Sequence, residues 1–237
     1  MTTRGELLYE GKGKRVFATD DPDTLVLEFK DTATAFDGKK KSELDDKGRI
    51  NNRINDHIMG LLAASGIPVH HVRRISETES EVRRLEMLPV EAVVRNVVAG
   101  SLARRLGMEE GAVLDRPVFE FFYKSDELGD PMINRYHILA FGWATEAEVE
   151  RMVELSFRVN EVLYPLFEAG GMRLVDYKLE FGRFRGELVL GDELTPDGCR
   201  LWDTETGEKL DKDRFRRDLG DVLEGYREIG RRLGVEL

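Results

Sequence analysis

Cysteine is almost absent from this sequence, since Cys199 is the only one among 237 residues. A disulfide within the chain needs two cysteines and a cysteine-rich zinc site needs several, so the sequence excludes both. Long apolar runs are missing as well. The stretch MTTRGELLYEGKG has no apolar signal core, and no run approaches the roughly 20 apolar residues that span a membrane. We therefore expect a cytoplasmic protein with no membrane partner.

Basic residues are fewer than acidic residues in this sequence. Lys and Arg number 36 against 46 Asp and Glu, which gives a net charge of −10. Nucleic-acid binding generally relies on cations that neutralise phosphates, so we expect no nucleic-acid partner. A local basic pocket for one phosphorylated small molecule remains compatible with this charge. The hydrophobic share of 41% and the charged share of 35% are typical of a folded globular protein.

Several common catalytic motifs are missing. The four histidines, His57, His70, His71 and His137, do not have the HExxH spacing of zinc proteases. The GxSxG motif of serine hydrolases and the GxxxxGK[ST] phosphate loop are absent too. The sequence therefore gives no indication of Ser–His or Cys–His nucleophilic catalysis.

The apolar residues predict an α+β fold, with strands early in the chain and helices mixed in later. Strands are expected in 6–31, VHHVRRI, SEVRRLEML and VEAVVRNVVAG. Helices are expected at about 45–65, 145–169 and 211–233, and in SLARRLG with Ser101 as N-cap. The stretch TPDGCRLWD reads as a loop. We divide the chain into a β-rich part, residues 1–88, and a larger α+β part, residues 89–237.

Two basic stretches lie near the N-terminus. In YEGKGKRVF, glycines between two strands let backbone N–H groups approach a phosphate, and Lys12 and Lys14 supply charge. An ordinary basic hairpin turn explains this stretch equally well. The run Lys39 to Lys41 reads as a solvated loop. Asparagine is a poor helix former, so the cluster Asn51 to Asn55 in a predicted helix hints at polar recognition.

Arg95 interrupts a run that should be buried, VVRNVVAGS. A buried guanidinium is costly unless it meets an anion. Together with the strand-to-helix turn that ends at Ser101, Arg95 could hold a phosphate or a carboxylate. The alternative is an internal salt bridge, for instance with Glu91.

The stretch DYKLEFGRFRGELVLGDE predicts two strands around a turn, with acids gathered on its polar side. Mg²⁺ prefers oxygen ligands and commonly takes one or two carboxylates in addition to nucleotide phosphates. Glu180 and Asp192 are the candidate ligands. The alternative is a solvated acidic face in which Lys178 forms a plain salt bridge.

The predicted register of this hairpin separates the two acids. The apolar faces align when the turn is 182–185, which places Asp192 near Val175. Glu180 and Asp192 then lie roughly 13 Å apart along the ladder. A shared metal would need a bend at Gly191, or two ions bridged by a polyphosphate.

Taken together, these stretches resemble the SAICAR synthetase family, the phosphoribosylaminoimidazole-succinocarboxamide synthases of purine biosynthesis, over almost the whole chain. The resemblance is carried by LLYEGKGKRVF, FKDTATAFDGKKK, KGRINNRIN, LPVEAVVRNVVAGSLARRLG, VDYKLEFGRFRGELVLGDELTPDGCRLWD and DKDRFRRDLG. It implies an ATP- and Mg²⁺-dependent ligase that joins L-aspartate to 5-aminoimidazole-4-carboxylate ribonucleotide (CAIR). It also implies a fold similar to ATP-grasp enzymes and protein kinases, with ATP between a small β-rich part and a larger α+β part.

The resemblance implies that phosphorylation turns the unreactive carboxylate of CAIR into an acyl phosphate, which the amine of aspartate attacks. Such a reaction needs positioned anions, cations and metal rather than a protein nucleophile. By this resemblance, Lys12, Gly13 and Lys14 cover the ATP phosphates. Met87 and Leu88 form part of the hinge that contacts adenine.

The resemblance assigns the remaining candidates in the same way. Glu180 and Asp192 hold Mg²⁺, Lys178 steadies the site, and Asp37 contacts the imidazole or its metal. The phosphate of the ribonucleotide is bound by Arg95, Ser101 and Arg200. Lys124 and the cluster Asn51 to Asn55 help either to place aspartate or to close the site.

Two other functions stay open at this point. A small-molecule kinase would use the same nucleotide site but leave the phosphate on an alcohol, and a regulator would bind nucleotide without catalysis. We also expect a homo-oligomer, with a dimer as one arrangement, although nothing in the sequence fixes the number of subunits.

Overall fold

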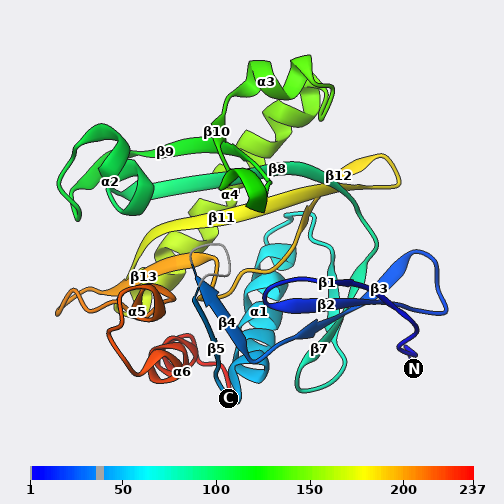
Figure 1. The fold of residues 1–237 in the computed structure, drawn as a ribbon, viewed down its shortest axis with the longest axis horizontal. Helices are drawn as coiled ribbons and strands as arrows, with labels where there is room; N and C mark the ends of the chain where they lie inside the picture. The colour runs from blue at the N-terminus through cyan, green and yellow to red at the C-terminus, as the bar shows by residue number, and fades with distance from the viewer. Residues whose placement is uncertain (1, 36–39) are drawn as a thin grey trace.

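The computed structural model describes residues 2–35 and 40–237 and has two main sheets, both antiparallel (Figure 1). The smaller sheet has the order β1 (Leu7–Glu10), β2 (Lys14–Ala18), β3 (Thr24–Phe29), β7 (Glu79–Arg83), β6 (His71–Arg74). The larger has the order β10 (Met132–Ile133), β9 (Val113–Tyr123), β8 (Glu86–Val97), β11 (Met172–Phe184), β12 (Glu187–Gly191), and β13 (Cys199–Asp203) pairs with β11. A separate ribbon joins β4 (Thr32–Ala35) to β5 (Lys40–Glu43). The α+β prediction is confirmed.

Two long helices have the predicted positions. Helix α1 covers Lys47–Ala64 and α4 covers Glu146–Ala169. The capping box predicted for α4 is present, because the Thr145 hydroxyl accepts from the Glu148 N–H and the Glu148 carboxylate accepts from the Thr145 N–H. The short elements are α2 (Gly100–Leu106), η1 (Asp126–Leu128), α3 (Arg135–Ala140), α5 (Asp213–Arg216) and α6 (Val222–Arg232). No helix in the described part of the chain is long and apolar enough to cross a membrane.

Some predicted elements were wrong. The helix expected at 211–233 is two helices, because Asp218, Gly220 and Asp221 have φ values of +55°, +73° and +44° in the connection. Such values end a right-handed helix. TPDGCRLWD contains a strand, β13, whose Leu201 packs in the core against β11. SEVRRLEML divides between β7 and β8, which belong to different sheets.

The main core lies between the larger sheet and helices α1 and α4. Tyr177 and Leu179 of β11 face it, as do Ile54 of α1 and Met152 of α4. Figure 1 shows α4 running behind the larger sheet and α1 standing between the two sheets. The residues of β11 that alternate with Tyr177 and Leu179 therefore point to the opposite face of the larger sheet.

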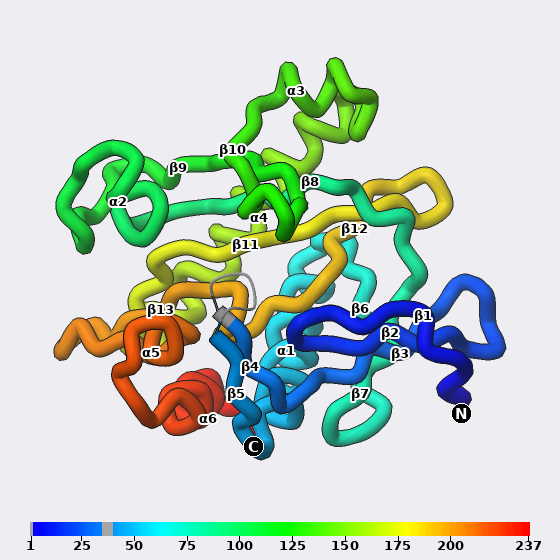
Figure 2. The backbone as a smooth tube through the Cα atoms, viewed as in Figure 1, coloured from blue at the N-terminus to red at the C-terminus, as the bar shows by residue number. Residues whose placement is uncertain are grey.

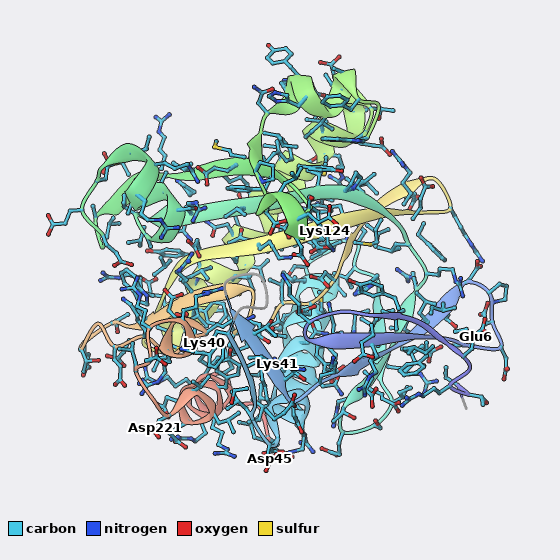
Figure 3. The ribbon with its side chains drawn as sticks, in the orientation of Figure 1. Glu6, Lys40, Lys41, Asp45, Lys124 and Asp221 are labelled. Atoms are coloured by element: carbon cyan, nitrogen blue, oxygen red, sulfur yellow. The ribbon has the colours of Figure 1, made fainter. Side chains whose placement is uncertain are left out.

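The loop predicted for the lysine run is wrong for the two lysines that the structure describes. Lys40 and Lys41, labelled in Figure 3, lie on β5. Lys40 donates to Asp218 at 2.6 Å and lies over the Phe215 ring, so a solvated loop is wrong for this residue. Asp37 and Lys39 lie outside the described residues.

Candidate active site

The polar face of β11 carries Asp176, Lys178 and Glu180 at every second position. In the antiparallel pairing with β8, Asp176 lies opposite Arg95 and Glu180 lies opposite Glu91. Strand β9 contributes Glu120 beside β8, and β13 contributes Arg200 opposite Asp176. Charged side chains from four neighbouring strands thus meet on the face of the sheet that is turned away from the core. They form two clusters, one at each end of this stretch of β11.

We call the first cluster the lysine cluster. Lys178 Nζ donates to Glu91 at 2.9 Å and to Glu180 at 2.5 Å, and lies 3.7 Å from Asp192. Its other members are Lys124, which donates to the second oxygen of Glu180, and Lys14, which pairs with Asp192 and Glu193. Figure 3 shows Lys124 at the edge of the larger sheet, towards β1 and β2.

The hairpin register that brings these acids together differs from the predicted one. Glu180 lies opposite Gly191, so Asp192 is one residue further along and not near Val175. The turn is the two residues Arg185 and Gly186, both with positive φ, rather than 182–185. The predicted separation of Glu180 and Asp192 was therefore wrong, and both carboxylates reach the ammonium group of Lys178.

Asp192 and Lys178 stabilise each other's charged forms. Burial would raise the pKa of Asp192, but Lys14, Lys178 and Lys124 outweigh it and keep this pKa well below its usual range. Burial would lower the pKa of Lys178, yet Glu180, Asp192 and Glu91 raise it well above its ordinary value. At neutral pH Asp192 therefore presents a carboxylate and Lys178 an ammonium group, whereas burial raises the pKa of Glu91.

This donor set fits Mg²⁺ that is completed by a nucleotide. Glu180 is 2% exposed, and its carboxylate and that of Asp192 meet at one ammonium group. No three acid, histidine or cysteine side chains in the described ranges lie close enough together to hold an ion by themselves. One or two carboxylates are the usual protein share of a Mg²⁺ shell whose other ligands are phosphates and water.

We call the second cluster the arginine cluster. Arg95 is 3% exposed and donates through Nε to Glu120 at 2.6 Å, through Nη1 to Asp176 at 2.8 Å and through Nη2 to the Ser101 hydroxyl at 3.0 Å. Arg200 donates to the same Asp176 at 2.8 Å. The internal salt bridge considered as the alternative for Arg95 is therefore present, but its partners are Glu120 and Asp176. Glu91 pairs with Lys178 instead.

The turn into α2 brings the remaining members to Arg95. The N-cap of α2 is Ala99, so Ser101 is not the cap but lies in the first turn. Its hydroxyl accepts from Arg95 and, at 3.1 Å, from Arg105, which also pairs with Glu120. Gly100 has φ +54°, and a Cβ there would lie 2.7 Å from Arg200 Nη2. The close approach of backbone to guanidinium therefore requires glycine at this position.

A cavity of about 170 Å³ joins the clusters. Its polar lining consists of Arg95, Asp176, Lys178, Asp197, Arg200 and Arg216. Three of these residues were predicted as site residues from the sequence. Asp176 and Asp197 were not, although the alternation of Asp176 with Lys178 and Glu180 was a signal for the first.

The turn between β1 and β2 lies over the lysine cluster. Lys12 donates to Asp126 at 2.7 Å, and Lys14 reaches the cluster itself. A Cβ at Gly13 would have no neighbour within 4 Å, so this part of the turn is open. Met87 is partly exposed on β8, whereas the side chain of Leu88 is buried in the core. A nucleotide could therefore reach Leu88 only through its backbone.

The asparagines of α1 bind protein groups. Asn51 donates to Asp197 at 3.0 Å, and Asn52 donates to the carbonyl of Ser76 at 3.1 Å. Asn55 accepts from the Leu194 N–H at 3.0 Å. In this structure these side chains bind other segments of the same chain, and their recognition of a substrate stays a prediction.

The family profile described as SAICAR synthetase matches residues 7–233. The chain belongs to this family. A curated phosphoribosylaminoimidazole-succinocarboxamide synthase from Hahella chejuensis is 62% identical over 98% of each chain. The crystal structure of such a synthase from Ehrlichia chaffeensis has a TM-score of 0.96 and 42% identity, covering 98% of this chain and 100% of that one. A SAICAR synthetase in complex with ADP has a TM-score of 0.93 and 46% identity, covering 96% and 97%.

Membership in this family decides between the functions that the sequence left open. The chain is an ATP-dependent ligase that joins L-aspartate to CAIR in purine biosynthesis. The kinase and the regulator are not supported. The family does not by itself assign a role to each residue of the two clusters.

Asp197 lies in the segment that connects Asp192 of the lysine cluster to Arg200 of the arginine cluster. Its contacts with α1 and α6 allow a prediction about stability. Asp197 accepts from Lys47 at 2.5 Å, from Asn51, and from the Tyr226 hydroxyl at 2.7 Å. Burial would raise the pKa of Asp197, but Lys47 and Lys212 outweigh it and hold this pKa well below its usual range. Asp197→Asn should lower the free energy of unfolding by about 3–5 kcal/mol at pH 7, because it leaves the Lys47 ammonium buried without its counter-charge.

The sign of the pH dependence follows from the lowered pKa. The contribution of Asp197 is complete above the unfolded-state pKa of about 4, and it is lost as the pH falls towards the folded-state value. Urea unfolding at pH 7, 5 and 3.5 should therefore show a smaller difference between Asp197→Asn and the natural chain at the lowest pH. Asp221→Asn, at an exposed position, is the control. An equal loss at all three pH values would contradict the charge argument.

Proposed function

We propose that the lysine cluster is the centre at which ATP phosphorylates the carboxylate of CAIR, and that the arginine cluster holds the phosphate of this ribonucleotide. The observation that supports this is the shared polar face of β11, which carries both clusters with a cavity between them. Asp176 and Glu180 lie four positions apart, roughly 13 Å along a strand. Such a spacing lets one end of a ribonucleotide contact Arg95 while its other end faces Lys178.

The reaction is proposed to take place in two steps. A carboxylate oxygen of CAIR attacks the γ-phosphorus of ATP, the bond to the β-phosphate oxygen breaks, and ADP leaves with that electron pair. The uncharged amine of aspartate then attacks the carbonyl carbon of the acyl phosphate. The C–N bond forms, phosphate leaves, and the nitrogen loses a proton. No protein nucleophile is required, in keeping with the residues found at the site.

The lysines are proposed to exchange carboxylate partners for phosphate oxygens when ATP binds. Lys14 and Lys178 stabilise the negative charge that moves between the carboxylate and the phosphates. Lys12 and Gly13 cover the phosphates from the β1–β2 turn, and Met87 with the Leu88 backbone contacts adenine. The SAICAR synthetase solved with ADP, 46% identical, supports nucleotide binding here.

Glu180 and Asp192 are proposed to hold Mg²⁺, which would shield the charge of the transferred phosphoryl group. Arg95, Ser101 and Arg200 contact the ribonucleotide phosphate, with guanidinium groups that suit two oxygens at once. Lys124 and Asp37 are proposed to contact aspartate and the imidazole, respectively. We further propose that the β-rich part of the chain ends near residue 88, where the α+β part begins. Following the expectations from the sequence, we also propose a cytoplasmic location and a homo-oligomer.

Release of ADP tests the overall proposal. With ATP, Mg²⁺ and CAIR present, we expect sustained ADP release only after L-aspartate is added, together with an absorbance change for the new amide. ADP release without aspartate, and with no amide, would mean transfer to another acceptor or hydrolysis. ATP binding without any ADP release would contradict catalysis by this site.

Asp192→Asn is expected to leave the fold intact and to lower turnover by roughly 100-fold or more, because it weakens the proposed metal site. Steady-state ADP release measures this. Glu187→Gln is a matched control, since it removes an exposed acid from the same strand region. Unchanged turnover in Asp192→Asn would remove Asp192 from the metal site.

Arg95→Lys should raise the KM for CAIR by about tenfold and change the KM for ATP little. The reason is that a point charge replaces a planar group that can bind two oxygens. Initial rates with one substrate varied at a time give both constants. A variant that is less stable but has an ordinary KM for CAIR would show that Arg95 only holds Glu120 and Asp176.

A further inference from the structure

The end of β12 is held by a segment that comes from the other sheet. The connection from α1 to β6 passes beside Leu190, whose N–H donates to the Pro68 carbonyl at 2.8 Å. The His70 N–H donates to the Leu190 carbonyl, also at 2.8 Å, and Val69 forms a parallel bridge with Leu190. Figure 2 shows the chain after β12 descending beside α1. The backbone that leads into Asp192 is therefore fixed from outside its own sheet.

Asp192 has a backbone conformation that most residues avoid. Its φ is +57°, in the left-handed region, which costs a residue with a Cβ roughly 1 kcal/mol or more. Aspartate visits this region more readily than most residues, and contacts from the surroundings can hold it there. Because the backbone sets the direction of the Cα–Cβ bond, this conformation also decides where the carboxylate of Asp192 points. It points at Lys14 and Lys178.

The side chain of His70 binds the carbonyl of this residue. His70 is 5% exposed, and its Nε2 lies 2.7 Å from the Asp192 carbonyl oxygen. A carbonyl oxygen only accepts, so Nε2 carries the proton and donates it. Two residues later, the Leu194 N–H donates to Oδ1 of the buried Asn55. Glu193 thus lies between two hydrogen bonds to side chains of the N-terminal half of the chain. Asp192 lies between the backbone bond at the Leu190 carbonyl and the His70 bond at its own carbonyl.

We propose that His70 and Asn55 are positioning residues, which keep Asp192 in its left-handed conformation so that its carboxylate faces the bound metal–nucleotide complex. The inference rests on the metal role proposed for Asp192. Without the two hydrogen bonds, Asp192 relaxes towards the common regions of backbone space and its carboxylate turns away from Lys178. Both side chains bind backbone groups, the Asp192 carbonyl and the Leu194 N–H, so both act on the carboxylate of Asp192 through the backbone.

The test measures binding of Mn²⁺ together with an ATP analogue that cannot transfer its γ-phosphate, followed by electron paramagnetic resonance. His70→Leu should weaken Mn²⁺ binding by roughly 10- to 100-fold, the usual effect of losing a group that orients a metal ligand. It should leave the KM for CAIR within about twofold, because the arginine cluster is untouched. His70→Gln should restore most of the affinity, since its amide N–H can replace the imidazole donor.

His71→Leu is the matched control. His71 is the next residue and its side chain is largely buried. Its Nε2 donates to the Asp56 carboxylate at 2.8 Å rather than to Asp192. It should leave Mn²⁺ binding unchanged. Equal weakening by His70→Leu and His71→Leu would overturn the proposal, because it would mean a general loss of structure. Equal weakening by His70→Leu and His70→Gln would overturn it as well, since the donor would then not matter.

Asp192→Asn in the same assay separates this inference from the proposed function. If Asp192→Asn leaves Mn²⁺ binding unchanged, the metal role itself fails. If Asp192→Asn weakens binding and His70→Leu does not, only the positioning role fails.

Two further measurements keep the proposal testable should His70→Leu not fold. Asn55→Ala removes the acceptor for Leu194 and should weaken Mn²⁺ binding in the same way without a change in the KM for CAIR. Nitrogen-15 spectra of the natural chain should show His70 in the tautomer protonated at Nε2. Protonation at Nδ1 alone, or unaltered Mn²⁺ binding in Asn55→Ala, would contradict the proposal.

Discussion

The alternation of side chains along β11 is the constraint on which the active site depends. One face of this strand supplies Tyr177 and Leu179 to the core, so the other face must carry Asp176, Lys178 and Glu180. Antiparallel pairing with β8 then fixes Arg95 and Glu91 on that same face. A shift of one residue in this register would bury a lysine in the apolar core and expose a tyrosine. The apolar packing of the sheet therefore sets the geometry of both charged clusters.

Charge pairing explains how so many ionised groups can be held in partly buried positions. A lone buried charge costs several kcal/mol, whereas the acids and cations of each cluster satisfy one another. Phosphate and carboxylate groups of the substrates carry the same sign as the acids that the lysines and arginines now contact. Binding can therefore proceed by exchange of one anionic partner for another, and no cation has to be left unpaired at any stage. This requirement favours flexible lysines at the proposed ATP site and a rigid guanidinium at the proposed ribonucleotide phosphate site.

Much of the fold could be predicted because it depends on local patterns. The apolar spacing in α1 and the capping box of α4 identified these helices to within two residues. The hairpin register could not be predicted in this way, because it depends on Arg185 taking a positive φ in a two-residue turn. The partners of Arg95 were missed for a related reason. Glu120 and Asp176 are 25 and 81 residues away in the chain, and only the sheet topology brings them together.

The asparagines of α1 are unusual in a buried helix, and contacts with a segment far away in the sequence explain them. Lys47, Asn51 and Asn55 recur at every fourth position, so they lie along one side of the helix. They bind the backbone of Leu194 and the carboxylate of Asp197, in the segment that connects the lysine cluster to Arg200. Side chains suited to an apolar core would leave these groups buried without partners. The helix that completes the main core therefore also holds the connection between the two clusters of the proposed active site, through its polar residues.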